Sequence, residues 1–95
     1  MILLKSVRAH VLIIGLVHGV SFRSSTKRKA DSLGLKGWVK NLENDTVEAV
    51  FEGSDDKVKE VLEWCSKGPP SARVDDMETE LSNYIGDLEG FDIIL

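Results

Sequence analysis

The chain has 95 residues, 42% of them hydrophobic, and a net charge of −4 at pH 7. This size fits one compact domain spanning residues 1–95 and leaves no room for a second core. No run of 18 or more uncharged apolar residues occurs, so the sequence excludes a helical membrane span and predicts no membrane partner. The single cysteine, Cys65, cannot close an intramolecular disulfide, and we therefore expect a cytoplasmic protein.

Charge is distributed unevenly along the chain. Residues 1–40 carry eight Lys and Arg against one acidic residue, a net of +7, whereas residues 41–95 carry four against fifteen, a net of −11. A basic half of this kind favours an anionic ligand by electrostatic steering. The alternative for the basic run 27–29 is that it forms only the solvated face of a helix.

The first predicted elements are a strand and a helix. Apolar and polar residues alternate over residues 7–13, as in a half-buried strand that ends near Gly15 and Gly19. The helix that follows can be capped by the side chain of Ser21, and Gly34 can adopt the left-handed conformation after its last turn. One face of this helix suits the core and comprises Phe22, Thr26, Ala30 and Leu33.

A β-hairpin and a second helix are expected next. Residues 36–41 and 46–52 are β-prone runs joined by the turn 42–45, where Asn and Asp tolerate the positive φ of a tight reversal. Ser54 can cap the second helix, whose first turn carries two acidic residues that favour the helix dipole. Its apolar stripe comprises Val58, Val61, Leu62 and Cys65.

The last third of the chain predicts two more strands. In residues 73–81, acids dominate one face and only Val74, Met77 and Leu81 suit burial, while apolar residues alternate over 91–95 in a short edge strand. The order of elements indicates an α+β fold, the ferredoxin-like βαββαβ sandwich. In this fold two helices pack on one face of a four-stranded, mainly antiparallel sheet, here with a short C-terminal edge strand added.

The loop between the first strand and the first helix is suited to phosphate. Its residues are Gly15, Leu16, Val17, His18, Gly19 and Val20. Unpaired N–H groups of such a loop and of the first helical turn converge at the positive end of the helix dipole. Arg23 lies in that turn, and its planar guanidinium can hold two phosphate oxygens and offset charge in a transition state. Taken alone, the loop is weak evidence, and a tight turn beside a surface arginine is the simpler interpretation.

Three motifs give this loop a more specific meaning. In the first motif, a glycine precedes the sequence Gly-Val-x-Phe-Arg, in which x is any residue. The matching residues are Gly15, Gly19, Val20, Phe22 and Arg23. The second begins Gly-Trp-Val-Lys-Asn and is matched by Gly37, Trp38, Val39, Lys40, Asn41, Val47 and Gly53. The third is a GPP-x-A-x-V stretch at Gly68, Pro69, Pro70, Ala72 and Val74. On these motifs the chain resembles the acylphosphatase family over nearly its whole length.

The resemblance implies an activity and residue roles. It implies that the chain hydrolyses acyl phosphates to a carboxylate and inorganic phosphate by in-line attack of water. It also implies that Arg23 binds the phosphoryl group, that Asn41 holds the water and that residues 15–20 form the phosphate cradle. The chemistry agrees, because a carboxylate leaves readily and positioning with charge stabilisation suffices. Without the motif, Asn41 could instead start the hairpin turn by bonding its own backbone.

The chain departs from the family pattern at a few positions. Leu16 and His18 stand where the family commonly has Arg and Gln, Asp45 stands where it has Gly, and Ser71 replaces a frequent Gly. Since a cradle works through backbone N–H groups, residues 16 and 18 bear on rate and substrate preference, and Asp45 bears on turn geometry. The departures leave open a second hypothesis, a catalytically weak or inactive acylphosphatase-like binding domain.

Other polar and aromatic groups are assigned no chemistry. His10 and His18 have no cysteine partners, so we expect no metal and no cofactor. Cys65 is expected to be a core hydrophobe. An RNA-binding sheet exposes aromatic side chains on its middle strands, whereas only Trp38 and Phe51 lie there, so no nucleic-acid partner is expected. The lack of a long exposed apolar stripe predicts a monomer.

Overall fold

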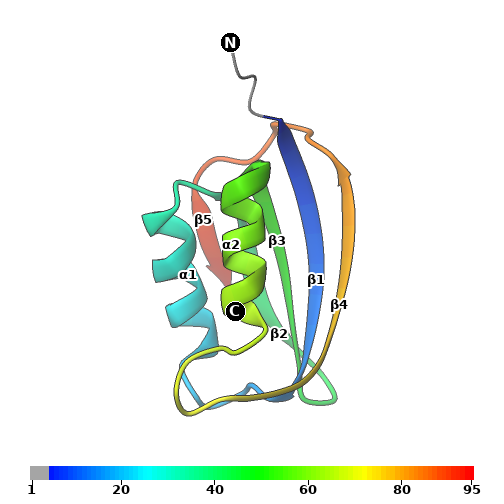
Figure 1. The fold of residues 1–95 in the computed structure, drawn as a ribbon. Coiled ribbons are helices and arrows are strands. Elements are labelled where there is room, and N and C mark those ends of the chain that lie inside the picture. Colours follow the sequence, from blue (N-terminus) through cyan, green and yellow to red (C-terminus); the bar gives the residue numbers. More distant parts are fainter. Residues whose placement is uncertain (1–4) are drawn as a thin grey trace.

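The computed structural model describes residues 5–95 and contains two helices and five strands (Figure 1). In chain order these are β1 (Ser6–Leu16), α1 (Phe22–Ser32), β2 (Lys36–Leu42), β3 (Thr46–Ser54), α2 (Asp55–Cys65), β4 (Arg73–Asn83) and β5 (Phe91–Ile94). The expected βαββαβ order is confirmed, and so is the short C-terminal edge strand.

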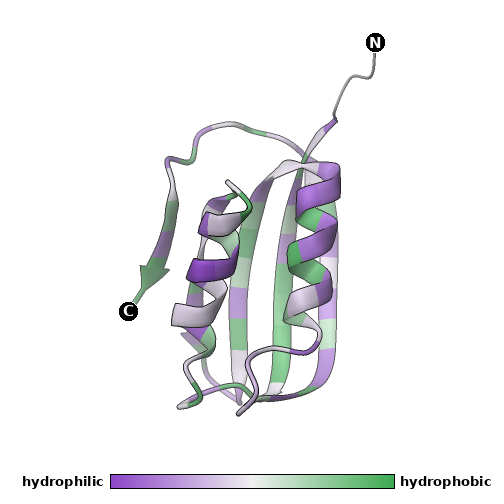
Figure 2. Cartoon of the chain, turned by 60° about the vertical axis from the view of Figure 1, so that its left-hand side comes forward, coloured by the Kyte–Doolittle hydropathy of each residue, from purple (hydrophilic) through white to green (hydrophobic). Residues whose placement is uncertain are grey.

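The strands form one sheet in the order β4-β1-β3-β2-β5. The pairs β1–β3, β1–β4 and β2–β3 are antiparallel, whereas β5 runs parallel to β2, with Phe91 opposite Gly37. Figure 2 shows both helices in front of the same face of the sheet, with apolar strand segments behind them. Because β4 and β5 lie at opposite edges, residues 84–90 must cross the end of the sheet between them (Figure 1).

The core lies between the helices and the face of the sheet that they cover. The alternation predicted for β1 is confirmed, because Val7, Ala9, Val11 and Ile13 are all buried. Phe51 on β3 stacks on Phe91 on β5, with ring centroids 5.4 Å apart. Burial raises the pKa of the Cys65 thiol to about 12, so this group stays protonated and packs as the expected hydrophobe.

Three local predictions were wrong. Ser21 precedes α1 but is left-handed, with φ 61°, and its hydroxyl makes no capping bond, since side-chain capping normally needs the extended backbone that it lacks. Ser54 makes no side-chain cap either, and the first N–H of α2, that of Asp55, donates to the carbonyl of Lys5. Leu81 is 58% exposed because it lies on the edge strand β4, while the helices pack against β1, β2, β3 and β5.

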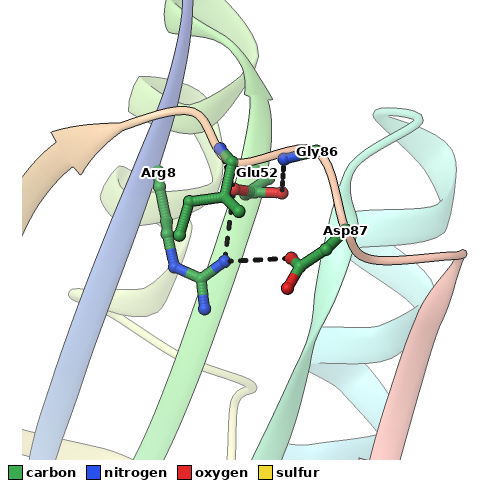
Figure 3. A network of polar contacts seen from close by, with 5 residues as sticks. Arg8, Glu52, Gly86 and Asp87 are labelled. Carbon is green, nitrogen blue, oxygen red and sulfur yellow. Dashed lines mark hydrogen bonds and ion pairs between the residues drawn. The ribbon is translucent and has the colours of Figure 1, made fainter.

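A buried carboxylate holds the crossing connection in place. Glu52 on β3 is only 1% exposed and accepts hydrogen bonds from the N–H groups of Ile85 (2.9 Å) and Gly86 (3.4 Å) and from Arg8 Nη1 (3.2 Å) (Figure 3). Burial alone would raise the pKa of this carboxyl, but the hydrogen bonds from Ile85, Arg8 and Gly86 outweigh it and hold the pKa below its ordinary value. Arg8 also reaches Asp87 at 3.8 Å, so the connection that delivers β5 is fixed at several points.

Replacement of Glu52 by alanine is expected to lower the free energy of unfolding by about 2 kcal/mol, because three partly exposed donors lose a buried, ionised acceptor. The folded-state pKa of Glu52 is depressed, so its contribution is complete above the unfolded-state pKa and is lost as pH falls through the folded-state value. Urea unfolding from about pH 7 to about pH 3 checks both effects. The exposed Glu78 on β4 provides the control; equal acid sensitivity in Glu52→Ala and Glu78→Ala would contradict this role.

Candidate active site

The loop between β1 and α1 turns its backbone amides to one side. The φ angle is positive at Gly19 (70°) and Ser21 (61°) but not at Val20 between them, an alternation that makes successive N–H groups converge on an anion. Within residues 5–95, the N–H groups of positions 18–21 donate to no other group of the chain. The first turn of α1 follows directly, and its amides have no acceptors within the helix. The donors of an anion cradle are therefore present.

In the first half of the loop, backbone N–H groups bond to other carbonyls of the chain and are not available to a ligand. The N–H of Gly15 donates to the carbonyl of Asp45 at 3.0 Å, and that of Val17 donates to the carbonyl of Gly15 at 3.0 Å. Gly15 adopts φ 146°, and a Cβ there would lie 2.2 Å from the carbonyl oxygen of Arg73, so only glycine fits. The amides that remain for a ligand thus lie from His18 onward.

Two hydrogen bonds tie this loop to the β2–β3 hairpin. Besides the bond to Asp45, His18 Nε2 lies 2.7 Å from the carbonyl oxygen of Thr46. That oxygen can only accept, so Nε2 donates. The hairpin turn itself has φ 58° at Asn44 and 54° at Asp45, as the sequence predicted, although Leu42 belongs to β2 and the turn is shorter than expected. The loop and the hairpin are therefore fixed relative to each other.

Arg23 and Asn41 lie in the wall of one pocket of about 290 Å³. Arg23 comes from the first turn of α1, and Asn41 lies near the end of β2, at the same end of the molecule (Figure 1). Asn41 follows the buried Val39 by two residues, so both side chains point to the face that the helices cover. Gly19 also lines this pocket, so the fold gathers a guanidinium, an amide and part of the loop.

The side chain of Asn41 forms no hydrogen bond within the part of the chain that the structure describes. Its backbone pairs with Val47 inside the β2–β3 ladder. The alternative role predicted for Asn41, starting the turn through its own backbone, is therefore not what the structure contains. The amide is left exposed at the pocket.

Not every loop residue faces this pocket. Val17 lines it, but Gly15, Leu16 and His18 line an adjacent hollow of about 260 Å³, which Val17 also borders. That hollow contains the ion pair between Arg73 and Asp75 (2.9 Å). The side chain of Val20 packs against the core and reaches neither space. Leu16 and His18, two of the positions that depart from the family pattern, thus line the adjacent hollow and not the pocket of Arg23.

Five further residues of the pocket, among them the buried Phe22, were not predicted to belong to the site. Ser21 and Ser24 bring hydroxyl groups, and Ile93 and Leu95 bring an apolar wall. Ser24 Oγ donates to the carbonyl of Ser21 at 3.2 Å, and its position beside Arg23 in the first helical turn is a signal that could have been used. No local signal identifies the wall, because it depends on the pairing of β5 with β2.

A sequence profile of the acylphosphatase family matches residues 9–93. The chain belongs to the acylphosphatase family. It is 49% identical over 88 residues to an acylphosphatase of Aeropyrum pernix, covering 92% of this chain and 87% of that one. It is 50% identical over 86 residues to an acylphosphatase of Syntrophobacter fumaroxidans, covering 90% and 89%. The crystal structure of the acylphosphatase from Bacillus subtilis is similar with a TM-score of 0.89 at 29% identity, covering 94% and 99%.

These comparisons confirm the family, the fold and the enzyme class that the motifs predicted, an acylphosphatase and hence a hydrolase. Among residues 5–95, no three His, Cys, Asp or Glu side chains are grouped to hold a metal ion. Over the same range, no helix has the length and apolarity needed to cross a membrane.

Proposed function

We propose that this chain hydrolyses acyl phosphates in the pocket between the β1–α1 loop and β2, with Arg23 and Asn41 as its catalytic residues. The observation that carries the proposal is that these two side chains, from different elements, line one pocket together with Gly19. The products are a carboxylate and inorganic phosphate.

Phosphate binding is assigned to the loop and to Arg23. The alternating φ signs from Gly19 to Ser21 direct amides toward one point at the start of α1, where the helix dipole also favours an anion. Arg23 adds a permanent positive charge with several donors in one plane. As the bond to the leaving carboxylate breaks, these fixed groups stabilise charge on the phosphoryl oxygens.

Asn41 is assigned to the attacking water. Its amide has both an acceptor and two donors, so it can orient a water without removing a proton outright. No His, Asp or Glu is among the residues that line this pocket in the described chain. A carboxylate is a good leaving group, so in-line attack needs positioning more than a general acid.

The alternative, a weak or inactive acylphosphatase-like binding domain, rested on the departures at residues 16, 18 and 45. Leu16, His18 and Asp45 line the neighbouring hollow rather than the pocket of Arg23 and Asn41. His18 bonds the hairpin through Thr46, and Asp45 adopts the left-handed turn. The changes therefore leave the proposed catalytic groups in place, which supports an active enzyme.

Benzoyl phosphate hydrolysis tests the proposal. The purified chain is expected to turn over benzoyl phosphate at the same rate with and without EDTA, because its own residues supply the positive charge. Inorganic phosphate is expected to inhibit competitively, because it occupies the same loop. A folded protein that binds phosphate but releases no benzoate would support the binding-domain alternative instead.

The remaining expectations from the sequence are kept as proposals: one domain over residues 1–95, a monomer, a cytoplasmic location, and no nucleic-acid or membrane partner. Phe51, one of two aromatic residues on the middle strands, faces the core, and the ring of Trp38 is covered by Lys40 Nζ at 5.3 Å. An RNA-stacking surface is therefore not supported. The free thiol of Cys65 is buried, in keeping with a reducing compartment. Light scattering tests the monomer.

A further inference from the structure

Ser21 adopts a backbone conformation that suits glycine better than serine. Its φ is 61° and its ψ is 28°, in the left-handed region, where the Cβ of an L-residue lies too close to the following carbonyl oxygen. Glycine carries no such penalty and is the usual residue at a position of this kind. The serine therefore costs the fold some stability, and its side chain is the part that glycine could not supply.

The backbone of Ser21 is held by the first turn of α1. Its carbonyl oxygen accepts the N–H of Ser25 at 3.0 Å and the hydroxyl of Ser24 at 3.2 Å. These two bonds fix the peptide group between residues 21 and 22. The fold therefore also sets the direction in which the side chain of Ser21 leaves the backbone.

The hydroxyl of Ser21 has no partner within residues 5–95. Ser21 is exposed, and its hydroxyl forms neither a cap bond nor another hydrogen bond with this part of the chain. The other hydroxyl that lines the pocket of Arg23 belongs to Ser24, and it is already donated to the carbonyl of Ser21. Of the two, the hydroxyl of Ser21 is thus the one left for a ligand.

The surroundings of this hydroxyl favour an anionic oxygen as its partner. Ser21 lines the same pocket as Arg23 and Asn41, and no Asp or Glu is among the lining residues of the described chain. No carboxylate there competes for the hydroxyl proton. A serine hydroxyl can donate one hydrogen bond, and a bond to a charged acceptor is roughly twice as strong as one to a neutral acceptor.

We propose that the hydroxyl of Ser21 is a further phosphate ligand, which donates to a phosphoryl oxygen beside Arg23. This inference rests on the proposed function, because it needs the phosphoryl group at the same loop and arginine. The backbone strain is present in the free protein, whereas the hydroxyl gains its partner only when phosphate binds. The contact exists in substrate and product alike, so it contributes to binding more than to the chemical step.

The test compares Ser21→Gly and Ser21→Ala, which both remove the hydroxyl but differ in backbone strain. Calorimetric titration with inorganic phosphate is expected to give a dissociation constant about five-fold above the parent value in both variants, as for the loss of one hydrogen bond. KM for benzoyl phosphate should rise equally, with kcat within about two-fold of the parent. The melting temperature should rise by about 4 °C in Ser21→Gly but not in Ser21→Ala, because alanine keeps the Cβ.

Ser25→Ala is the matched control. The hydroxyl of Ser25 accepts a bond from Arg28 and does not line the pocket, so this variant should bind phosphate like the parent. Weaker binding in only one of the two Ser21 variants would assign the effect to the backbone and overturn the role of the hydroxyl, as would unchanged binding in both or equal weakening in Ser25→Ala. A parent that binds phosphate but hydrolyses no benzoyl phosphate would overturn the proposed function, and the phosphate affinities would still decide the role of Ser21.

Discussion

Replacing Arg23 with alanine is expected to lower kcat for benzoyl phosphate by about 10³-fold. Arg23 is the only Lys or Arg among the residues lining the pocket in the described chain, so its loss leaves the backbone amides alone to offset charge on the phosphoryl oxygens. Inorganic phosphate should also inhibit much less strongly, because the guanidinium binds ground state and transition state alike. Steady-state kinetics with benzoyl phosphate and phosphate measures both effects.

Two further variants define the role of this guanidinium. Arg23→Lys should recover only part of the rate, because an ammonium group supplies charge without the planar pair of donors. Arg28→Ala removes an arginine of the same helix that bonds only Ser25 within the described residues, and it should keep the parent rate. If Arg28→Ala and Arg23→Ala had the same activity, the general basic charge of this half of the chain, and not the position of Arg23, would explain catalysis.

Replacing Asn41 with alanine is expected to lower kcat by about 10²-fold, because the water loses the group that orients it. The effect on phosphate binding should differ from that in the Arg23→Ala variant. Asn41 is proposed to contact the water and not the phosphate, so the inhibition constant of inorganic phosphate should stay near the parent value. The exposed amide makes no hydrogen bond within the described chain, and the melting temperature should therefore change little.

The control for this substitution is Asn83→Ala, at the exposed end of β4. It should retain full activity. A loss of phosphate inhibition in Asn41→Ala that matched the loss of rate would assign Asn41 to phosphate binding and contradict its role toward water. Together, the Arg23 and Asn41 variants separate binding of the phosphoryl group from attack upon it.

Most of the fold was predictable because each element buries a face that repeats in the sequence. The alternation along β1 and the stripe along α2 predicted the residues that are buried. Predictions failed where a neighbouring segment decides the outcome. Ser54 makes no side-chain cap, and the first amide of the helix, that of Asp55, is bonded by the carbonyl of Lys5 from another segment. Likewise, Leu81 has a buriable side chain but lies on a strand that no helix covers.

The candidate site was predictable only in part, for a similar reason. Arg23 and Asn41 could be named because the motifs that contain them are local. Ser24 could have been found from the same helical turn. The wall formed by Ile93 and Leu95 depends on a parallel pairing between distant segments, and on a connection held by Glu52. Neither leaves a pattern within a short window of sequence.

The added strand β5 also bears on how the protein avoids aggregation. Without it, the seven residues of β2 would form an open edge with unpaired backbone groups, next to an apolar core. Such an edge is a template for association with other chains. β5 replaces it with an edge of only four residues, and the opposite edge, β4, carries four acidic side chains that repel like copies. The strand that completes the pocket thus also limits the self-association of the sheet.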